Sequence, residues 1–401
     1  MRMQTSLLSI LCLAFSLSTF ASNQPPVTFD QIAKLTAPDG AANDQFGNSV
    51  AIDGNTMVVG KASGAVQSAF VYENNSGTVT QVAELTPSDG VAGDRFGNQV
   101  AISGNVIVVS AVEHANKKPH NTGSIYVYVK PAGGWADMTE TAELNLGQSG
   151  ASIGQTIGTN GSEVVSTAAT STTNGDVVVV WNEPSGGWAN SSKPNAELLT
   201  GSPGNALENV AISGNVIVAG SPQAFEYYGA TFLYVKPASG WNKIGITPTA
   251  RLVGSVQSGG GEAVAISGNT VVSSNGYGVY VFVKPSSGWA NMNETATLTD
   301  ANAENDLSAV AVSGGTVVAG DPAQLVGVNP GQGAAFVFLE PAGGWKNLTT
   351  ASAELAANDG NIGDNLGTSV AVSGGTVVAG APMAAIGSNT TQGAAYVFAQ
   401  Q

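Results

Sequence analysis

Pairs of carboxylates recur in this chain shortly ahead of apolar segments. Asp39 and Asp44 stand before Phe46, and the same spacing returns twice, with a looser group of three acids elsewhere. Oxygen-rich loops suit a hard cation or a basic ligand. Turn formation is the other explanation, because Asp-Gly pairs favour turns and a second Asp can hold the start of the next strand. The nine acids are Asp39 and Asp44, Asp89 and Asp94, Asp300, Glu304 and Asp306, and Asp359 and Asp364.

Histidine is scarce, and the chain has only His114 and His120, both in the segment 113–120 with Glu113. One Glu and two His are ligands that a transition metal accepts. A solvated loop is the simpler interpretation of such a polar segment. With one cysteine and no further histidine, the sequence disfavours a Ser-His-Asp or Cys-His arrangement. A carboxylate pair for glycoside hydrolysis stays open. No catalytic residue is therefore assigned.

Tryptophan recurs in the pattern Pro-x-x-Gly-Trp. A ring of exposed indoles can stack on sugars. Repetition at one place of a repeating unit favours a packing role instead. The five residues are Trp135, Trp188, Trp241, Trp289 and Trp345.

The composition predicts an acidic, all-β protein. Glycine supplies 52 of 401 residues and charged residues only 10%, which disfavours long surface helices, while 43% hydrophobic residues are enough for a core. The formal charge of −15 repels phosphate backbones, and Lys117-Lys118 is the sole basic cluster, so nucleic acid is not an expected partner.

The first residues predict a secretory signal peptide over residues 1–21. Arg2 precedes an apolar stretch from Leu7 to Phe20, and small residues stand where cleavage after Ala21 would need them. The mature domain would then span residues 22–401, secreted or periplasmic. Removal of the signal takes away Cys12, the only cysteine, so disulfides are not expected. No later segment is apolar and long enough to span a membrane.

A repeating unit underlies the whole domain. The marker Val-Ala-Ile-Ser-Gly-Asn, or a close relative, returns in seven copies that start at Val50, Val100, Ile157, Val210, Val264, Val310 and Val370. Each copy holds Ala-x-Leu, a polar loop, two apolar runs around a Gly-Asn or Gly-Gly pair, and an aromatic strand. Two-residue turns need positive φ, which Gly and Asn tolerate. The pattern predicts four short antiparallel strands per unit.

Seven such units predict a seven-bladed β-propeller that closes on itself. The last copy ends after its aromatic strand, near Phe398, and lacks a following Ala-x-Leu strand. One such Ala-x-Leu strand, at residues 31–35, comes before the first copy of the marker. We therefore expect the N-terminal strand to complete the seventh blade, which leaves only short, protected edges.

The unit resembles the FG-GAP repeat of integrin α-chain propellers and many secreted bacterial proteins. Phe46-Gly47 and Phe96-Gly97 match its first half, and Gly380-Ala381-Pro382 matches its second. The resemblance covers about residues 28–399. It implies a β-propeller, and the family includes adhesins, lectins and lipase-linked domains, so it does not fix a function.

Calcium is a cofactor that the resemblance suggests and this sequence does not support. Several FG-GAP propellers bind Ca²⁺ in an Asp-rich loop between the two inner strands. Here that loop has shrunk to the Gly-Asn turn, with no group of three carboxylates. We expect no calcium site there and assign no cofactor.

The expected function is non-catalytic binding or surface interaction, adhesion-like, by a monomer with an unknown protein or glycan ligand. A carbohydrate-binding lectin and a propeller-based glycosidase or lyase are the alternatives. Because blades six, seven, one and two are neighbours in a closed ring, their acids and long loops predict one acidic arc on one face. The candidate ligand residues there are Asp39, Asp44, Asp89, Asp94, Asp306, Asp359 and Asp364.

Overall fold

The structure, a computed structural model, describes residues 27–64, 67–115, 122–147, 151–169, 177–200, 206–255, 260–304 and 306–401. The predicted signal peptide, the dipeptide Lys117-Lys118 and His120 lie outside these residues.

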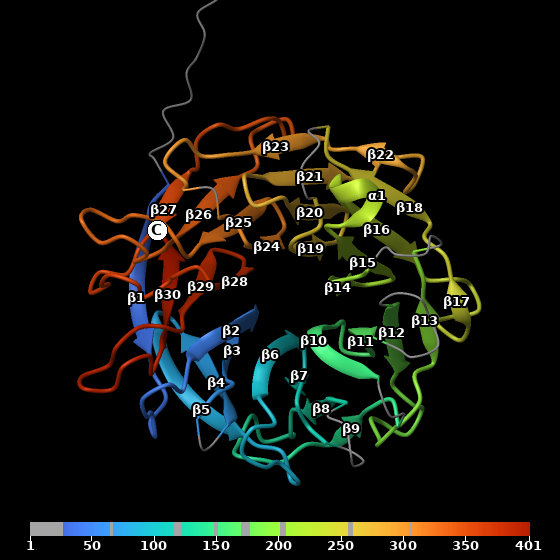
Figure 1. Cartoon of the computed structure of the whole chain (residues 1–401), viewed down its shortest axis with the longest axis horizontal. Coiled ribbons are helices and arrows are strands. Elements are labelled where there is room, and N and C mark those ends of the chain that lie inside the picture. The colour runs from blue at the N-terminus through green and yellow to red at the C-terminus, as the bar shows by residue number, and fades with distance from the viewer. Residues whose placement is uncertain are drawn as a thin grey trace, which may run out of the picture.

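Seven antiparallel sheets stand around a central axis, as the repeat predicts (Figure 1). Each sheet is one blade, and its first strand lies innermost. The blades in chain order are β2 (Phe46–Asp53), β3 (Thr56–Lys61), β4 (Ser68–Asn75) and β5 (Thr78–Leu85); β6 (Phe96–Ser103), β7 (Val106–Ala111), β8 (Ser124–Val129) and β9 (Ala142–Leu144); β10 (Ser152–Thr159), β11 (Glu163–Ala169), β12 (Val177–Asn182) and β13 (Ala196–Leu198); β14 (Asn209–Ser213), β15 (Val216–Ser221), β16 (Ala230–Val235) and β18 (Ala250–Val253); β19 (Val264–Ser267), β20 (Thr270–Ser274), β21 (Val279–Val283) and β23 (Ala296–Leu298); β24 (Ala309–Ser313), β25 (Thr316–Asp321), β26 (Ala334–Leu339) and β27 (Ala353–Leu355); and β28 (Ser369–Ser373), β29 (Thr376–Ala381), β30 (Ala394–Gln400) and β1 (Phe29–Leu35).

The ring closes as expected through its N-terminal strand. β1 pairs antiparallel with β30, from Phe29 opposite Gln400 to Leu35 opposite Ala395. The first strand of the chain thus becomes the outermost strand of blade seven. Two short strands, β17 (Ile244–Ile246) and β22 (Met292–Asn293), pair in parallel with the outer strands of blades three and four, which covers those edges. The short segment α1 (Ala224–Tyr227), which has left-handed backbone at Phe225 and Glu226, lies between β15 and β16.

The inner hairpins define one face of the ring, here called the turn face. In six of the seven hairpins the turn glycine has a φ between 52° and 59°, which an L-residue adopts only with strain. Four of the serines that precede these turns have a structural role, because the hydroxyl of each accepts the turn N–H of the next blade. Ser373 accepts from Gly54 at 3.0 Å and so joins blade seven to blade one. The same contact links Ser213 with Gly268, Ser267 with Gly314 and Ser313 with Gly374, while Asp53 serves Gly104.

Glycine also lets neighbouring blades touch backbone to backbone. A Cβ at Gly60 would overlap the carbonyl oxygen of Gly97 in the next blade. The same clash arises between Gly380 and Gly47, where the ring closes. The Phe-Gly half of one repeat therefore packs on the Gly-Ala-Pro half of the repeat before it. This close packing explains why both halves of the motif contain glycine.

The core lies between the blades. All six residues of β3 and of β7 are buried, as expected of strands covered on both faces. The hydrophobic clusters join strands of adjacent blades, such as Val318 of blade six with Val370 of blade seven. The five tryptophans of the Pro-x-x-Gly-Trp pattern belong to this core, with exposures of 0–8%, so the predicted packing role is confirmed. Buried indoles offer no stacking surface for a sugar.

Candidate functional site

The face opposite the turns carries the segments that lead into each inner strand and the loops between the second and third strands. We call it the loop face and the leading segments lead-in loops. Both kinds of loop touch, as predicted: the Ser63 N–H donates to the Asp44 carbonyl at 3.3 Å, and the Glu113 N–H to the Asp94 carbonyl at 3.0 Å. Within the described residues, no helix is long and apolar enough to cross a membrane.

The second aspartate of each pair has a structural task. Asp44, Asp94 and Asp364 are buried, and each carboxylate accepts the N–H of the residue three positions before it, at 2.8 Å. The carboxylate thereby fixes the turn just ahead of the inner strand. Burial raises the pKa of Asp364, although the N–H of Asn361 and the charge of Lys34 oppose this effect. The turn-forming explanation thus accounts for one acid of each pair.

The first aspartate of each pair stays about half exposed and contacts a different donor in each blade. Asp39 pairs with Lys61 at 2.7 Å, and Asp359 with Lys34 at 2.6 Å. Burial acts to raise the pKa of Asp359, but hydrogen bonds from Lys34 and Tyr396 and the charge of Lys34 hold it below its ordinary value. These carboxylates are exposed, yet a positive charge from the chain already lies beside them.

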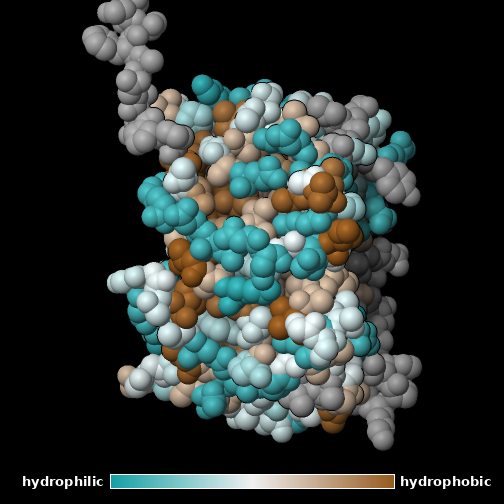
Figure 2. All heavy atoms as spheres, turned by 90° about the vertical axis from the view of Figure 1, so that its left-hand side faces the viewer, coloured by the Kyte–Doolittle hydropathy of each residue, from teal (hydrophilic) through white to brown (hydrophobic). Residues whose placement is uncertain are grey.

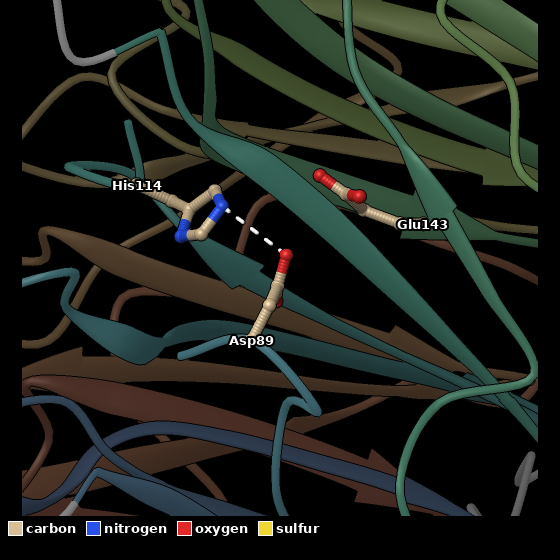
Figure 3. A group of neighbouring side chains, drawn as sticks. All are labelled: Asp89, His114 and Glu143. Carbon is tan, nitrogen blue, oxygen red and sulfur yellow. Dashed lines mark ion pairs between the residues drawn. The ribbon is translucent and has the colours of Figure 1, made fainter. Parts of the chain in front are cut away.

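Blade two replaces the lysine with a histidine. His114 is only 7% exposed, so the interpretation of this residue as part of a solvated loop was wrong. Its Nδ1 lies 2.8 Å from Asp94 Oδ2, and its Nε2 lies 3.5 Å from Asp89 Oδ2 (Figure 3). Across from the ring stands Glu143 of β9, which the sequence did not single out (Figure 3). Potential ligand atoms of Asp89, His114 and Glu143 all lie within 4.8 Å of one another, and the described part of the chain has no second such group of three.

Hydrogen bonds orient the carboxylates of this cluster. The Tyr126 hydroxyl donates to Asp89 Oδ1 at 2.9 Å, and the Ser124 hydroxyl donates to Glu143 Oε1 at 2.6 Å. Burial, followed by the neighbouring carboxylates Asp89, Glu143 and Asp94, raises the pKa of Tyr126 far above its ordinary value, so its hydroxyl remains a donor. The Ala-x-Leu pattern held a signal for Glu143, because the middle residue of that strand faces the lead-in loop.

Blade six departs from the two-aspartate pattern. Asp300 accepts N–H groups of Asn302 and Ala351, and the turn-holding task falls to the buried Asp321, which accepts the N–H of Glu304 at 2.8 Å. Asp306 faces other acids instead. Burial raises the pKa of Glu262, and the charges of Asp306 and Glu208 raise it further. Glu208 and Glu262 stand one and two positions before the inner strands of blades four and five. The sequence pattern had not singled out these two residues.

The long loops of blades six and seven clasp the following blade. In the blade-seven loop, the carbonyls of Thr390 and Gln392 accept the N–H groups of Asn43 and Phe46 of blade one, both at 2.9 Å. In the blade-six loop, the Gln332 carbonyl accepts the N–H of Leu366, which leads into blade seven, at 2.9 Å. These loops therefore fix blade seven against blade one and blade six against blade seven. The length of these loops is thus explained by contact between blades, without the need for a ligand.

A polar pocket of about 410 Å³ opens at the axis on the turn face. Residues of all seven inner hairpins line it, among them Asp53 and Glu163, which pairs with Lys236. Asp53, which stands directly before the inner turn of blade one, already accepts the Gly104 N–H at 2.6 Å. In the described residues these turns have neither the length nor the oxygen donors of a calcium loop, so the residues present do not fit that ion.

Three segments of the chain, residues 29–72, 79–128 and 349–398, match the family model of the FG-GAP repeat. They are the parts of blades one, two and seven that carry the aspartate pairs. No curated protein sequence matches the chain. Among solved structures, the crystal structure of the WD40 β-propeller domain of Doa1 is similar, with a TM-score of 0.55 over 93% of this chain and 97% of that one. The identity is 10%, so this likeness shows the fold alone.

Proposed function

The chain belongs to the FG-GAP repeat proteins, and we propose that its seven-bladed ring is a secreted, non-catalytic binding module that docks a protein ligand on the loop face. Propellers of many functions share this scaffold, so the surface of the ring, and not its fold, indicates the function.

The distribution of exposed apolar side chains carries the proposal. Of the ten large hydrophobic residues that are exposed in the described part of the chain, eight lie on loops of the loop face. Two of them, Val328 and Ile362, are 87% and 67% exposed. Exposed apolar side chains that gather on one face favour an interaction surface, and here they lie on loops of blades two, four, five, six and seven. The eight are Val91, Phe225, Tyr228, Tyr277, Leu325, Val328, Ile362 and Met383.

The flank of the ring differs from this face. Figure 2 shows the side at blade seven, where apolar residues are scattered between polar ones. Only Val235 and Ile244 of the exposed large hydrophobics lie away from the loop face in the described chain. The flank thus offers isolated apolar side chains, which need no partner to explain them.

Charge and rigidity define the ligand class. With a formal charge of −15 and half-exposed acids such as Asp39 and Asp89 on the loop face, a ligand with a basic rim and an apolar centre is complementary. The inter-blade clasps hold the loops in place before binding, which lowers the entropy lost on association. We therefore expect a protein or peptide ligand of that composition, outside the cytoplasm.

Selection of peptides from a random display library on the immobilised chain tests the proposal. We expect peptides rich in Lys, Arg and aromatic residues, whose binding is lost in a Tyr277→Ser, Val328→Ser, Ile362→Ser variant. The matched control is Val235→Ser, Ile244→Ser on other parts of the surface. Peptides that bind the loop-face variant as well as the wild type, or that lose binding only to the control, would overturn the proposal.

A further inference from the structure

We propose that Asp89, His114 and Glu143 form a binding site for a divalent transition-metal ion of the zinc type on the loop face of blade two. This inference goes beyond the docking function, with which the site shares Asp89, and the site differs from the calcium loops that the FG-GAP resemblance suggests. Those loops would lie at the inner turns, on the opposite face of the ring.

The geometry fits a metal of that size. Zinc bonds to nitrogen and oxygen are about 2.1 Å long, so the ligand atoms of a tetrahedral site stand about 3.4 Å apart. The separation of His114 Nε2 and Asp89 Oδ2 is 3.5 Å. A carboxylate oxygen of the partly buried Glu143 lies within 4.8 Å of a potential ligand atom of each of the other two residues (Figure 3), and metal binding would draw it closer. Three protein ligands leave the fourth position to water.

Each of the three ligands has a second partner that orients it, as in zinc sites of known proteins. Asp94 binds His114 Nδ1 at 2.8 Å, which points Nε2 toward Asp89 and Glu143. Tyr126 occupies one oxygen of Asp89, and Ser124 occupies one oxygen of Glu143. Carboxylate–histidine contacts of this kind set the imidazole tautomer and increase its basicity as a ligand. The cluster thus has the outer contacts of a metal site.

Blade one shows which group occupies the corresponding place in a neighbouring blade. In blade one, the Lys61 ammonium lies between Asp39 and Asp44, at 2.7 and 3.8 Å, and is 1% exposed. Strand pairing puts Lys61 opposite Phe46 and Ala111 opposite Phe96, so blade two has alanine where blade one has this lysine. The ion pairs of the described residues bring no Lys or Arg to Asp89, Asp94 or Glu143. Among the described residues, three carboxylates share one imidazole, an arrangement that suits a bound dication.

The donor set selects among metals. An imidazole with two carboxylates suits zinc and its neighbours in the first transition row, whereas Ca²⁺ prefers six to eight oxygen ligands. We expect Zn²⁺ and Co²⁺ to bind and Ca²⁺ to compete poorly.

Calorimetric titration of the full chain with ZnCl₂, after dialysis against a chelator, tests the inference. We expect one zinc per chain, and binding that is lost in His114→Phe and in Glu143→Gln. Tyr126→Phe keeps the ring and removes the hydroxyl that orients Asp89, so we expect an affinity about 10-fold lower. Calcium in large excess leaves the zinc isotherm unchanged.

The matched control is Glu84→Gln, because Glu84 occupies in blade one the strand position of Glu143 and accepts the Ser68 hydroxyl as Glu143 accepts that of Ser124. We expect wild-type zinc affinity for this variant. Thermal unfolding without metal shows that each variant is folded, and the Co²⁺ absorption spectrum reports the ligand field separately. The absence of stoichiometric zinc binding to the wild type would overturn the inference, as would full affinity in folded Glu143→Gln and His114→Phe.

Discussion

Blades one and two are near copies that neutralise the charge of their paired aspartates in different ways. Both place two aspartates ahead of a Phe-Gly pair, bury the second and leave the first about half exposed. Blade one sets the Lys61 ammonium between its acids, and blade two sets His114 there with Glu143 opposite. An ammonium completes the charge balance within the chain, whereas an imidazole adds charge only when it is protonated. Blade one therefore balances the charge of its aspartates with its own lysine, whereas blade two is arranged to take a cation.

The largest effect should come from breaking what the two blades share. Gly60→Ala would drive a Cβ into the carbonyl oxygen of Gly97 at their junction. We expect a loss of about 3 kcal/mol in the free energy of unfolding, because backbone at this contact cannot move without displacing a blade. Urea denaturation measures it.

The control for this change is Gly104→Ala, at a turn with positive φ and no atom near the added Cβ. Its expected cost is about 1 kcal/mol, from the left-handed backbone alone. Equal losses for the two variants would show that backbone contact between blades does not matter.

The second prediction distinguishes blade one from blade two. Lys61→Met leaves the buried Asp44 without its cation, and we expect a loss of about 2 kcal/mol that zinc does not restore. Zinc should instead raise the melting temperature of this variant by as much as that of the wild type, since the proposed metal site in blade two is intact. Thermal unfolding with and without ZnCl₂ checks both statements. A Lys61→Met chain as stable as the wild type would remove the basis of the comparison.

Blade seven offers a third and smaller effect, through pH. Lys34 lies over Tyr396 and pairs with Asp359, and the pKa of Asp359 is below its ordinary value of 3.8. A carboxylate with a lowered pKa stabilises the fold above its ordinary pKa, and this stability is lost as the pH falls through the lowered value. For Lys34→Met we expect a deficit of about 0.5 kcal/mol, since the pair is partly solvated.

The deficit of Lys34→Met should be complete at pH 7 and close as Asp359 becomes protonated below pH 3.8. Denaturant titrations at several pH values follow it. A deficit that persists unchanged into strong acid would mean that lost packing on Tyr396, and not the ion pair, is its cause.

The sequence predicted the ring because its signals are local. The Gly-Asn turns mark each inner hairpin, and the spare N-terminal strand predicts the closure that β1 and β30 make. It also predicted correctly that the lead-in loops and the loops between second and third strands share a face. The placing of the candidate aspartates as a ligand arc remains a prediction.

The contacts of the candidate site were beyond the sequence because they depend on registers between strands. Lys61 reaches Asp39 across 22 positions, and Glu143 reaches His114 only through the pairing of β8 with β9. His114 stands in a polar segment, so the residue types around it do not indicate that its side chain is buried. Repetition shows which residues maintain the fold, whereas a departure in one copy becomes visible only when the copies are superposed.

Anomalous X-ray scattering at the zinc edge, from crystals of the full chain grown with ZnCl₂, tests the contrast between blades one and two most directly. We expect one strong peak within bonding distance of His114 Nε2, Asp89 and Glu143, and no peak between Asp39 and Asp44, where Lys61 lies. A peak at the blade-one pair, or none at blade two under conditions in which zinc is bound elsewhere, would contradict it.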